Sequence, residues 1–321
     1  MKETMETPLL AGKKGKSFLT LIDWEPHEIE ALLQSALKLK SLRNKGEHGQ
    51  PLKGKSLAML FEKPSTRTRV SFEVGMKELG GFTVLLRNDE MQLGRGESIE
   101  DTAGVLSRFV DAILIRTHEH ARIERLADAA TIPVINGLSD QAHPCQALAD
   151  LLTILEKKGS LKGVKLTYVG DGNNVLHSLI QASALTGIDL HVATPPGYEP
   201  DPAVWKYSEQ IAGQTGASLS FHYDPAVSVQ GADVVYTDVW ASMGQEEEKE
   251  ERSKTFASYQ VNASLMEKAK PDAIFMHCLP AYRGLEVTEE VLQGPQSVVF
   301  DQAENRLHAQ KALLVAILAD G

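Results

Sequence analysis

The sequence is poor in cysteine and in long apolar runs, and both shortages narrow the class of protein. Only two cysteines occur among 321 residues, Cys145 and Cys278, which argues against a disulfide framework or a cysteine-based metal site. No apolar run approaches the roughly 18–20 residues of a membrane-spanning helix. Residues 1–16 lack the apolar stretch of a signal peptide. We therefore expect a cytoplasmic protein with no membrane partner.

Positive charge is also scarce, because 33 Lys and Arg stand against 43 Asp and Glu, a formal net charge of −10. Nucleic acid is therefore not an expected partner. An anionic ligand would need a local basic cluster, since the chain as a whole repels it. The length, with 42% hydrophobic and 24% charged residues, is typical of a globular protein with two domains.

Short apolar runs alternate with longer amphipathic segments along the chain, which is the pattern of βαβ units around a parallel sheet. Strands are expected at 56–62, 83–87, 112–116, 133–136, 165–169, 190–193, 218–222, 234–238, 273–277 and 297–300. Helices are expected at 26–42, 67–79, 99–109, 121–130, 143–158, 175–185, 202–212, 263–270 and 303–318. The pattern predicts an α/β fold of two doubly wound domains, each with a central parallel sheet, joined by interdomain helices.

The domain boundary is expected at the helix 143–158, because Gly159-Ser160 ends it and a strand follows at 165. This gives domains of 1–150 and 151–321 and suggests a ligand cleft between them. Polar residues fall just after the expected strands: Ser65, Arg116, His143, Asn173, Asp238 and Cys278. Because parallel sheets bind ligands at the carboxyl ends of their strands, these residues are candidates for the site.

Residues 61–73, FEKPSTRTRVSFE, combine the end of a strand with the start of a helix. A helix start presents unpaired backbone N–H groups and the positive end of the helix dipole. Here Ser65 is a suitable N-cap, and hydroxyls and two arginines surround it. Arginine is usually placed at the other end of a helix, so this arrangement favours an external anion, most naturally a phosphate. The alternative is a capped helix with a solvated basic first turn.

Several other segments have a purely structural interpretation or suggest a different ligand. The turn Gly170-Asp171-Gly172 resembles a dinucleotide fingerprint, but Val175 replaces the third glycine and no acid ends the following strand, which disfavours NAD. The charged run 246–252 is typical of a solvated loop or a short exposed helix. Cys278 could be a small core residue. A covalent mechanism is not expected, because His277 alternates to the opposite side of the strand.

Five segments together resemble the aspartate and ornithine carbamoyltransferase family: STRTR at 65–69, RTH at 116–118, HPCQ at 143–146, DVWASMG at 238–244 and HCLP at 277–280. They occur in the family's order and at its approximate spacing, over nearly the whole chain. The last two look like the ornithine branch. The resemblance implies carbamoyl phosphate and L-ornithine as substrates, citrulline and phosphate as products, and no metal or organic cofactor. It also implies a homo-oligomer, a trimer or a multiple of trimers.

The resemblance implies roles for individual residues. Carbamoyl phosphate would be bound by Ser65, Thr66, Arg67, Thr68, Gln92, Arg116, His143, Gln146, Cys278, Leu279 and Arg306. Ornithine would be bound by Asn173, Asp238, Ser242 and Met243. The catalytic set would be Arg67, Arg116, His143, Asp238 and Cys278. Gln92 would reach into a neighbouring subunit's site, and a last helix at about 303–319 would pack back on the carbamoyl-phosphate domain, 1–150, leaving 151–321 as the ornithine domain.

The chain departs from the family at one point. The family's Leu-Pro-Arg continuation reads LPAYR at 279–283, which leaves open whether Arg283 takes over the missing arginine's role. Two other functions stay open. The acceptor could be another amine such as putrescine or N-acetylornithine. A non-catalytic phosphate- or amino-acid-binding paralogue would be expected to lose one of Arg67, Arg116, His143 or Cys278, and all four are present.

Overall fold

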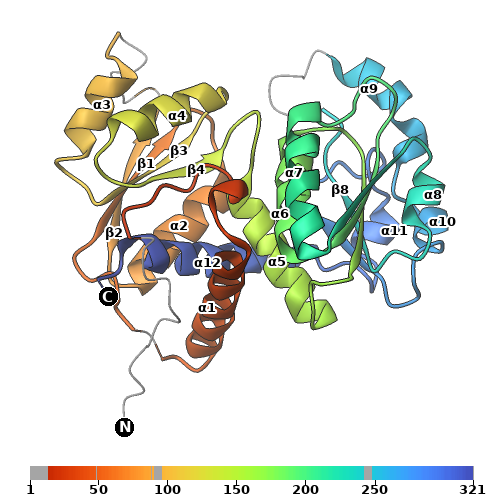
Figure 1. Ribbon diagram of the computed structural model, residues 1–321, viewed down its shortest axis with the longest axis horizontal. Coiled ribbons are helices and arrows are strands. Elements are labelled where there is room, and N and C mark those ends of the chain that lie inside the picture. Colours follow the sequence, from red (N-terminus) through yellow and green to blue (C-terminus); the bar gives the residue numbers. More distant parts are fainter. Residues whose placement is uncertain (1–13, 48, 88, 90–95, 242–247, 321) are drawn as a thin grey trace. The chain divides into compact units, whose positions relative to one another are not determined.

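The computed structural model of the chain describes residues 14–47, 49–87, 89, 96–241 and 248–320. The chain folds into two compact units. Unit 1 holds the residues up to Leu152 and those from Asn305 onward, and unit 2 holds Thr153–Glu304. The chain passes between them within α5 (Pro144–Lys158) and again within α12 (Val299–Leu318). Each unit is a parallel sheet with helices on both faces (Figure 1), so the predicted α/β fold is confirmed.

The sheet of unit 1 has four parallel strands in the order β2-β1-β3-β4. They are β1 (Ser56–Phe61), β2 (Phe82–Arg87), β3 (Ala112–Arg116) and β4 (Val134–Leu138). On one face, alternate residues such as Leu60 and Ile113 form a buried cluster with α3 (Ile99–Leu106) and α4 (His120–Ala129). Alternation in a strand sends the intervening residues to the other face, so both faces of the sheet are covered.

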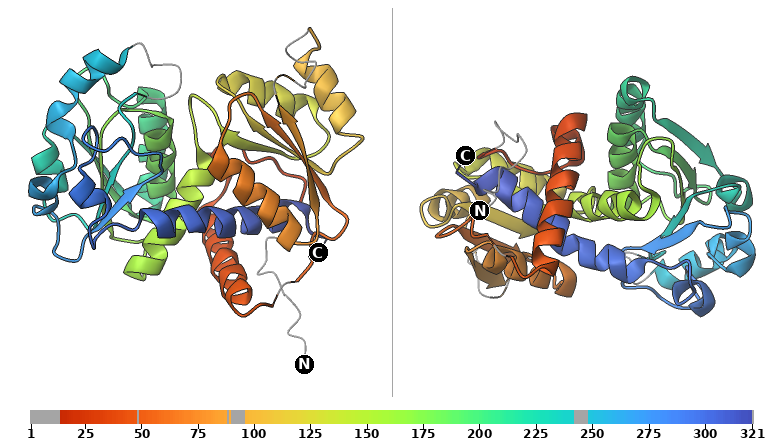
Figure 2. Two further views of the ribbon diagram at one scale, coloured as in Figure 1. Left: turned by 180° about the vertical axis from the view of Figure 1, so that it is seen from behind. Right: turned by 90° about the horizontal axis from the view of Figure 1, so that it is seen from below.

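The other face carries α2 (Thr66–Glu78), and α2 lies beside α12 (Figures 1 and 2). A Cβ atom at Gly75 would lie 3.2 Å from Lys311 Cγ, so glycine permits this close approach. Lys311 Nζ lies 2.7 Å from Glu78 Oε2, and Arg43 Nε of α1 (Pro26–Asn44) lies 2.8 Å from Glu78 Oε1. The Glu78 carboxylate therefore joins three helices of unit 1.

The sheet of unit 2 has five parallel strands in the order β7-β6-β5-β8-β9. They are β5 (Lys165–Val169), β6 (Asp189–Ala193), β7 (Ser218–His222), β8 (Val234–Thr237) and β9 (Ile274–His277). Helices α6 (Asn174–Thr186) and α7 (Pro202–Thr215) lie together over one face. On the other face, Val169 and Phe275 belong to an apolar cluster with short helices. These are α8 (Pro225–Val229), α10 (Ala263–Met266) and α11 (Glu289–Leu292).

The strand predicted at 297–300 is wrong. Ser297 forms only an isolated bridge with Phe275, in which Phe275 N donates to Gln296 O at 2.8 Å and Val298 N donates to Phe275 O at 3.0 Å. The chain then turns into α12, which begins at Val299. The β-branched pair Val298-Val299 favours a strand locally, but these valines are buried where the helix starts.

The other predicted strands and helices are present, with ends shifted by a few residues. The sequence did not predict α8, α11 or the short 3-10 turns at Leu21–Asp23 and Ala257–Tyr259. Part of the charged run forms α9 (Lys249–Thr255), one of the two structures expected there. In the described part of the chain, no helix is both long and apolar enough to cross a membrane.

The Glu78 contacts give a stability prediction. Lys311→Met should destabilise unit 1 by about 2 kcal/mol, the usual loss for a buried hydrogen bond to a charged group. Burial acts to raise the pKa of Glu78, but the hydrogen bonds and charges of Lys311 and Arg43 lower it below 4.5. The stabilisation is therefore present above about pH 4.5 and is lost as the pH falls through the lowered folded-state pKa.

Urea unfolding followed by circular dichroism at about pH 7 and about pH 4 measures both effects. The difference between Lys311→Met and wild type should shrink at the lower pH. Lys77→Met, on the exposed side of α2, is the control. A loss at neutral pH no larger than that of the control would contradict the prediction.

Candidate active site

In unit 1 the connectivity creates a switch point between β1 and β3. The chain runs from β1 outward to β2 and then returns to β3 on the other side of β1. In open α/β sheets, ligands bind outside the carboxyl ends of the strands at such a point. Ser65 follows β1 there, and Arg116 is the last residue of β3. Two of the three residues predicted from the strand ends of this sheet therefore lie at the switch point, and the third, His143, follows β4.

Helix α2 presents its N-terminus at this point. Ser65 is the N-cap in an extended conformation, and its Oγ accepts a hydrogen bond from Thr68 N at 3.3 Å. Thr66 begins the helix and is exposed, Arg67 is half-buried, and Thr68 is fully buried. The remaining N–H groups and the helix dipole give this end of the helix a partial positive charge.

Three arginines surround a buried histidine. His143 precedes the first residue of α5 and is 6% exposed, while Arg306 and Arg116 are 2% and 7% exposed. Burial is the largest cause that holds the pKa of His143 well below 6.5, and the charges of Arg306, Arg116 and Arg67 lower it further. The ring is therefore neutral at neutral pH and can donate or accept a hydrogen bond without adding charge.

Neutral partners hold Arg306 in place. Its Nη1 donates to Gln146 Oε1 at 2.8 Å, and its Nη2 donates to Thr68 Oγ1 at 3.3 Å. Gln146 Nε2 in turn donates to Asp150 Oδ1 at 2.8 Å. These two contacts orient the guanidinium, and both acceptors are neutral oxygens.

This arrangement suits an anion. Like charges that are buried together repel each other unless an opposite charge lies between them. Arg67 pairs with no carboxylate among the residues that the structure describes. The guanidinium groups could bond an anion such as a phosphate group, and the neutral His143 ring could bond an adjoining carbonyl oxygen. Cys145 is excluded as a nucleophile, because burial raises its pKa to about 12.

Unit 2 has a switch point between β5 and β8, since the chain moves from β5 outward to β7 and returns to β8 beside β5. Asn173 follows β5 and Asp238 follows β8. Asn173 Nδ2 donates to Asp238 Oδ2 at 2.8 Å. Asn173 Oδ1 caps α6 by accepting from Val175 N at 3.0 Å and Leu176 N at 3.1 Å. The sequence placed both residues at strand ends, and the structure joins them.

Cys278, which follows β9, completes this group. Its Sγ donates to Asp238 Oδ1 at 3.0 Å. Asp238 is 5% exposed and accepts one hydrogen bond on each carboxylate oxygen. Each oxygen keeps further lone pairs, so the carboxylate can still accept a hydrogen bond from an ammonium group. Such an acceptor fits the amino group of an amino acid.

His277 supports the turn after Cys278. The ring is fully buried. Its Nδ1 accepts from Leu279 N at 2.8 Å, and its Nε2 lies 3.2 Å from Glu286 Oε1. Leu279 has a φ of +57°, a left-handed conformation that costs a leucine free energy. The hydrogen bond to His277 holds the residue in it.

Asp238, His277 and Cys278 place possible metal-binding atoms within 4.8 Å of one another. Both His277 nitrogens already have partners, and the Cys278 thiol bonds to Asp238. A metal would have to break these contacts to bind all three residues. For the same reason His277 is not placed to deprotonate Cys278.

Gln92, Ser242 and Met243 lie outside the described residues. Arg283 Nε lies 2.5 Å from Glu289 Oε2, with both side chains about half exposed, so Arg283 is engaged by an acid at the surface. Sequence reasoning missed Glu286, whose link to His277 left no signal in the sequence. It also missed the burial of Arg252, which is 6% exposed within a run expected to be solvated.

Comparison with known proteins gives the class of the molecule. The family model "Aspartate/ornithine carbamoyltransferase, carbamoyl-P binding domain" matches residues 16–156. The model "Aspartate/ornithine carbamoyltransferase, Asp/Orn binding domain" matches residues 162–317. The protein is thus a carbamoyltransferase.

Individual relatives of known name are similar to this chain over nearly their whole length. Ornithine carbamoyltransferase of Anoxybacillus flavithermus is 60% identical over 305 residues, which covers 95% of this chain and 97% of the relative. The anabolic ornithine carbamoyltransferase of Pyrococcus furiosus is 58% identical over 310 residues, 97% of this chain and 98% of the relative. The solved ornithine carbamoyltransferase of Pyrococcus furiosus superimposes with a TM-score of 0.93 at 57% identity, covering 95% and 97% of the two chains. The chain belongs to the aspartate/ornithine carbamoyltransferase family.

The neutral state of His143 gives a pH prediction. An unfolded histidine takes up a proton near pH 6.5, whereas folded His143 does so only at lower pH. Wild type should therefore lose stability relative to His143→Gln as the pH falls below about 6.5, by up to about 1.4 kcal/mol per pH unit. Thermal unfolding across this range measures the loss, with the exposed His27→Gln as control. An imidazole NMR titration of His143 with a midpoint at or above pH 6.5 would contradict the prediction.

Proposed function

We propose that the protein transfers the carbamoyl group of carbamoyl phosphate to the δ-amine of L-ornithine, giving L-citrulline and phosphate. The observation that carries this proposal is the grouping of Arg67, Arg116 and Arg306 around neutral His143 at the start of α2. A carbamoyl phosphate molecule joins a phosphate to a carbonyl group, and these side chains offer partners for both. The names of the relatives support ornithine as the acceptor.

The groups in unit 1 would bind and activate carbamoyl phosphate. Ser65, Thr66, Arg67, Thr68 and Arg116 hold the phosphate and neutralise its charge as it leaves. Arg116, His143 and Thr68 stabilise the oxyanion that forms on the carbonyl oxygen. Gln146 and Arg306 complete the set of groups from unit 1. Cys278 and Leu279, which belong to unit 2, would also bind the carbamoyl group. Positioning and electrostatics supply most of the acceleration, because the mechanism forms no covalent intermediate with the enzyme.

The groups in unit 2 would bind ornithine. Asp238, held by Asn173, accepts a hydrogen bond from the α-ammonium group, and Ser242 and Met243 bind the backbone atoms. Cys278 beside Asp238 favours the neutral form of the δ-amine. The lone pair of that amine attacks the carbonyl carbon, the bond from carbon to the phosphate oxygen breaks, phosphate leaves with its electron pair, and the nitrogen loses a proton. Residues 1–150 would then be the carbamoyl-phosphate domain and 151–321 the ornithine domain.

We propose that the active form is a homo-oligomer, a trimer or a multiple of trimers, located in the cytoplasm. In this assembly Gln92 would reach into the active site of a neighbouring subunit. Exposed apolar side chains on an edge strand support self-association. Phe82 and Val84 of β2 are 56% and 41% exposed, and Val70 of α2 is 49% exposed. An open strand edge with apolar residues is a common interface between copies of a chain. The anabolic Pyrococcus furiosus relative supports a role in arginine biosynthesis.

The direct test is citrulline formation by the purified protein with carbamoyl phosphate and L-ornithine. Free ornithine has a protonated δ-amine at neutral pH, with an ordinary pKa near 10.4, so the rate should rise with pH. Putrescine, N-acetylornithine and aspartate are the competing acceptors. Turnover with putrescine or N-acetylornithine alone would replace ornithine in the proposal. No turnover, or a flat rate from about pH 6 to 9 with chemistry limiting, would overturn the proposed mechanism.

Substitutions at two arginines of α2 distinguish a phosphate site from a helix that merely begins with basic, solvated residues. Arg67→Met should lower kcat/KM for carbamoyl phosphate at least 100-fold, or about 3 kcal/mol, as expected for a charged group that stabilises the transition state. Arg69→Met is the matched control, because Arg69 Nε pairs with Glu73 Oε1 at 3.0 Å and is 42% exposed. Steady-state kinetics decide between them. Equal losses in both variants would support the solvated-turn alternative instead.

The β2 edge gives a test of assembly. Val84→Glu should shift the protein toward a mass of 35.1 kDa, that of one chain, because a charge on an apolar interface opposes association. Light scattering after gel filtration measures the mass. Val227→Glu, at an exposed valine of unit 2, is the control and should assemble as wild type does. A wild-type protein of single-chain mass would overturn the oligomer proposal.

A further inference from the structure

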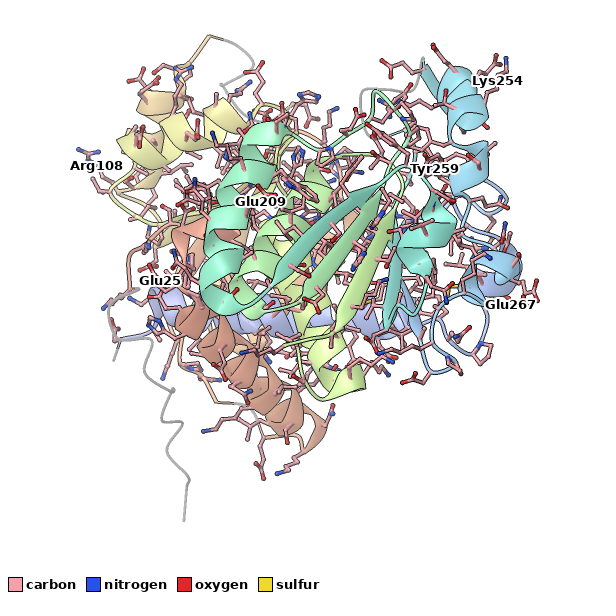
Figure 3. The ribbon with its side chains drawn as sticks, turned by 45° about the vertical axis from the view of Figure 1, so that its right-hand side comes forward. Glu25, Arg108, Glu209, Lys254, Tyr259 and Glu267 are labelled. Carbon is pink, nitrogen blue, oxygen red and sulfur yellow. The ribbon has the colours of Figure 1, made fainter. Side chains whose placement is uncertain are left out.

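Arg252 lies in a charged run, yet its side chain is only 8% exposed. It belongs to α9, and Lys254 of the same helix is exposed at the surface of unit 2 (Figure 3). Burying a guanidinium group costs several kcal/mol unless its N–H groups are bonded and its charge is paired. A buried arginine on an otherwise exposed helix therefore needs partners of its own.

The partners come from four places along the chain of unit 2. Arg252 Nη1 donates to Asp171 Oδ2 at 3.0 Å and to Trp240 O at 2.8 Å. Its Nε donates to Glu248 Oε2 at 2.8 Å. The guanidinium carbon lies 4.9 Å from the centroid of the Tyr198 ring, a cation–π distance. We refer to Asp171, Tyr198, Trp240 and Arg252 as the Arg252 cluster.

The cluster joins the two turns that carry the acceptor-binding groups. Asp171 lies two residues before Asn173, and Trp240 lies two residues after Asp238. Asn173 and Asp238 are themselves hydrogen-bonded. The Arg252 guanidinium thus connects the turn after β5 to the segment after β8, next to the point where their side chains meet.

The turn after β5 has little freedom on its other sides. Gly172 N donates to Tyr198 O at 2.9 Å, and Tyr168 Oη donates to Asp171 O at 3.0 Å. A Cβ atom at Gly172 would lie 2.4 Å from the carbonyl carbon of Glu199, so only glycine fits there. With these contacts fixed, the bond from Arg252 to Trp240 O sets where the Asp238 segment lies relative to this turn.

We propose that Arg252 is a positioning residue of the acceptor site. Through its bonds to Asp171 and Trp240, it fixes the positions of Asn173 and Asp238 relative to each other. It thereby sets the affinity for the acceptor substrate without touching that substrate itself. The inference rests on the proposed function, because ornithine is the ligand whose binding is measured. A displacement of about 1 Å in a binding group is enough to weaken a site substantially.

The test compares five variants by steady-state kinetics: three at the cluster, Arg252→Met, Arg252→Lys and Asp171→Asn, and two controls. Arg252→Met keeps the length of the side chain but removes the charge and the donors. Asp171→Asn removes the paired charge and keeps an acceptor. The controls are Lys254→Met, which removes a positive charge from the exposed side of the same helix, and Glu248→Gln, which removes the solvent-side partner, since Glu248 is 56% exposed.

We expect Arg252→Met to raise KM for ornithine by at least about tenfold, since each tenfold change is about 1.4 kcal/mol. KM for carbamoyl phosphate should stay within about twofold, and both controls should resemble wild type. Arg252→Lys should recover part of the loss, because one ammonium group can bond Asp171 or Trp240 but lacks the planar fork that reaches both.

The outcomes separate the two proposals. A wild type that makes no citrulline overturns the proposed function. An active wild type, with Arg252→Met no different from Lys254→Met in KM for ornithine, overturns the positioning role. Equal changes in KM for both substrates, or a lower melting temperature with unchanged KM, would make Arg252 a merely structural residue and also overturn it. If Arg252→Met does not fold, Asp171→Asn and Arg252→Lys decide, and unchanged KM for ornithine in both overturns the role.

Discussion

Parallel strand pairing is the constraint on which both groups of site residues depend. In each unit, two neighbouring strands send the chain in opposite directions, β1 and β3 in unit 1 and β5 and β8 in unit 2. Their carboxyl ends lie side by side while the connections that follow diverge. This geometry places the start of α2 beside Arg116, and Asn173 beside Asp238. A helix N-terminus and a strand-end side chain thereby become neighbours without any long loop.

The partners of a buried cation bear on what it can do. Arg306 donates to the neutral oxygens of Gln146 and Thr68, and these bonds orient its guanidinium within the candidate anion site. Arg252 is paired with Asp171, so its charge is neutralised and its role is to hold backbone and side chains in place. Among the described residues, Asp238 accepts hydrogen bonds from the Asn173 amide and the Cys278 thiol, and its carboxylate oxygens keep lone pairs for a further donor.

Much of the fold could be predicted because the apolar pattern of the strands is strong and local. The strands 112–116, 165–169 and 218–222 have the predicted bounds, and polar residues at strand ends located Arg116, Asn173 and Asp238. The pattern failed where tertiary contacts overrule local preference. At 297–300 the β-branched residues favoured a strand, but one bridge to Phe275 and the start of α12 took its place. Short helices such as α8 and α11 are too brief for a periodic signal.

The sequence by itself determined the fold class, the family and most candidate residues, because strand periodicity, helix caps and motif order are properties of neighbouring residues. Only the tertiary structure decided how those residues act. His143 is neutral because its ring is buried and the charges of three nearby arginines lower its pKa further. Asn173 uses its oxygen to cap α6 and its amide to hold Asp238. Arg252 is buried because Asp171, 81 residues away in sequence, meets it. Burial and long-range charge depend on which distant segments pack together, and no local pattern encodes them.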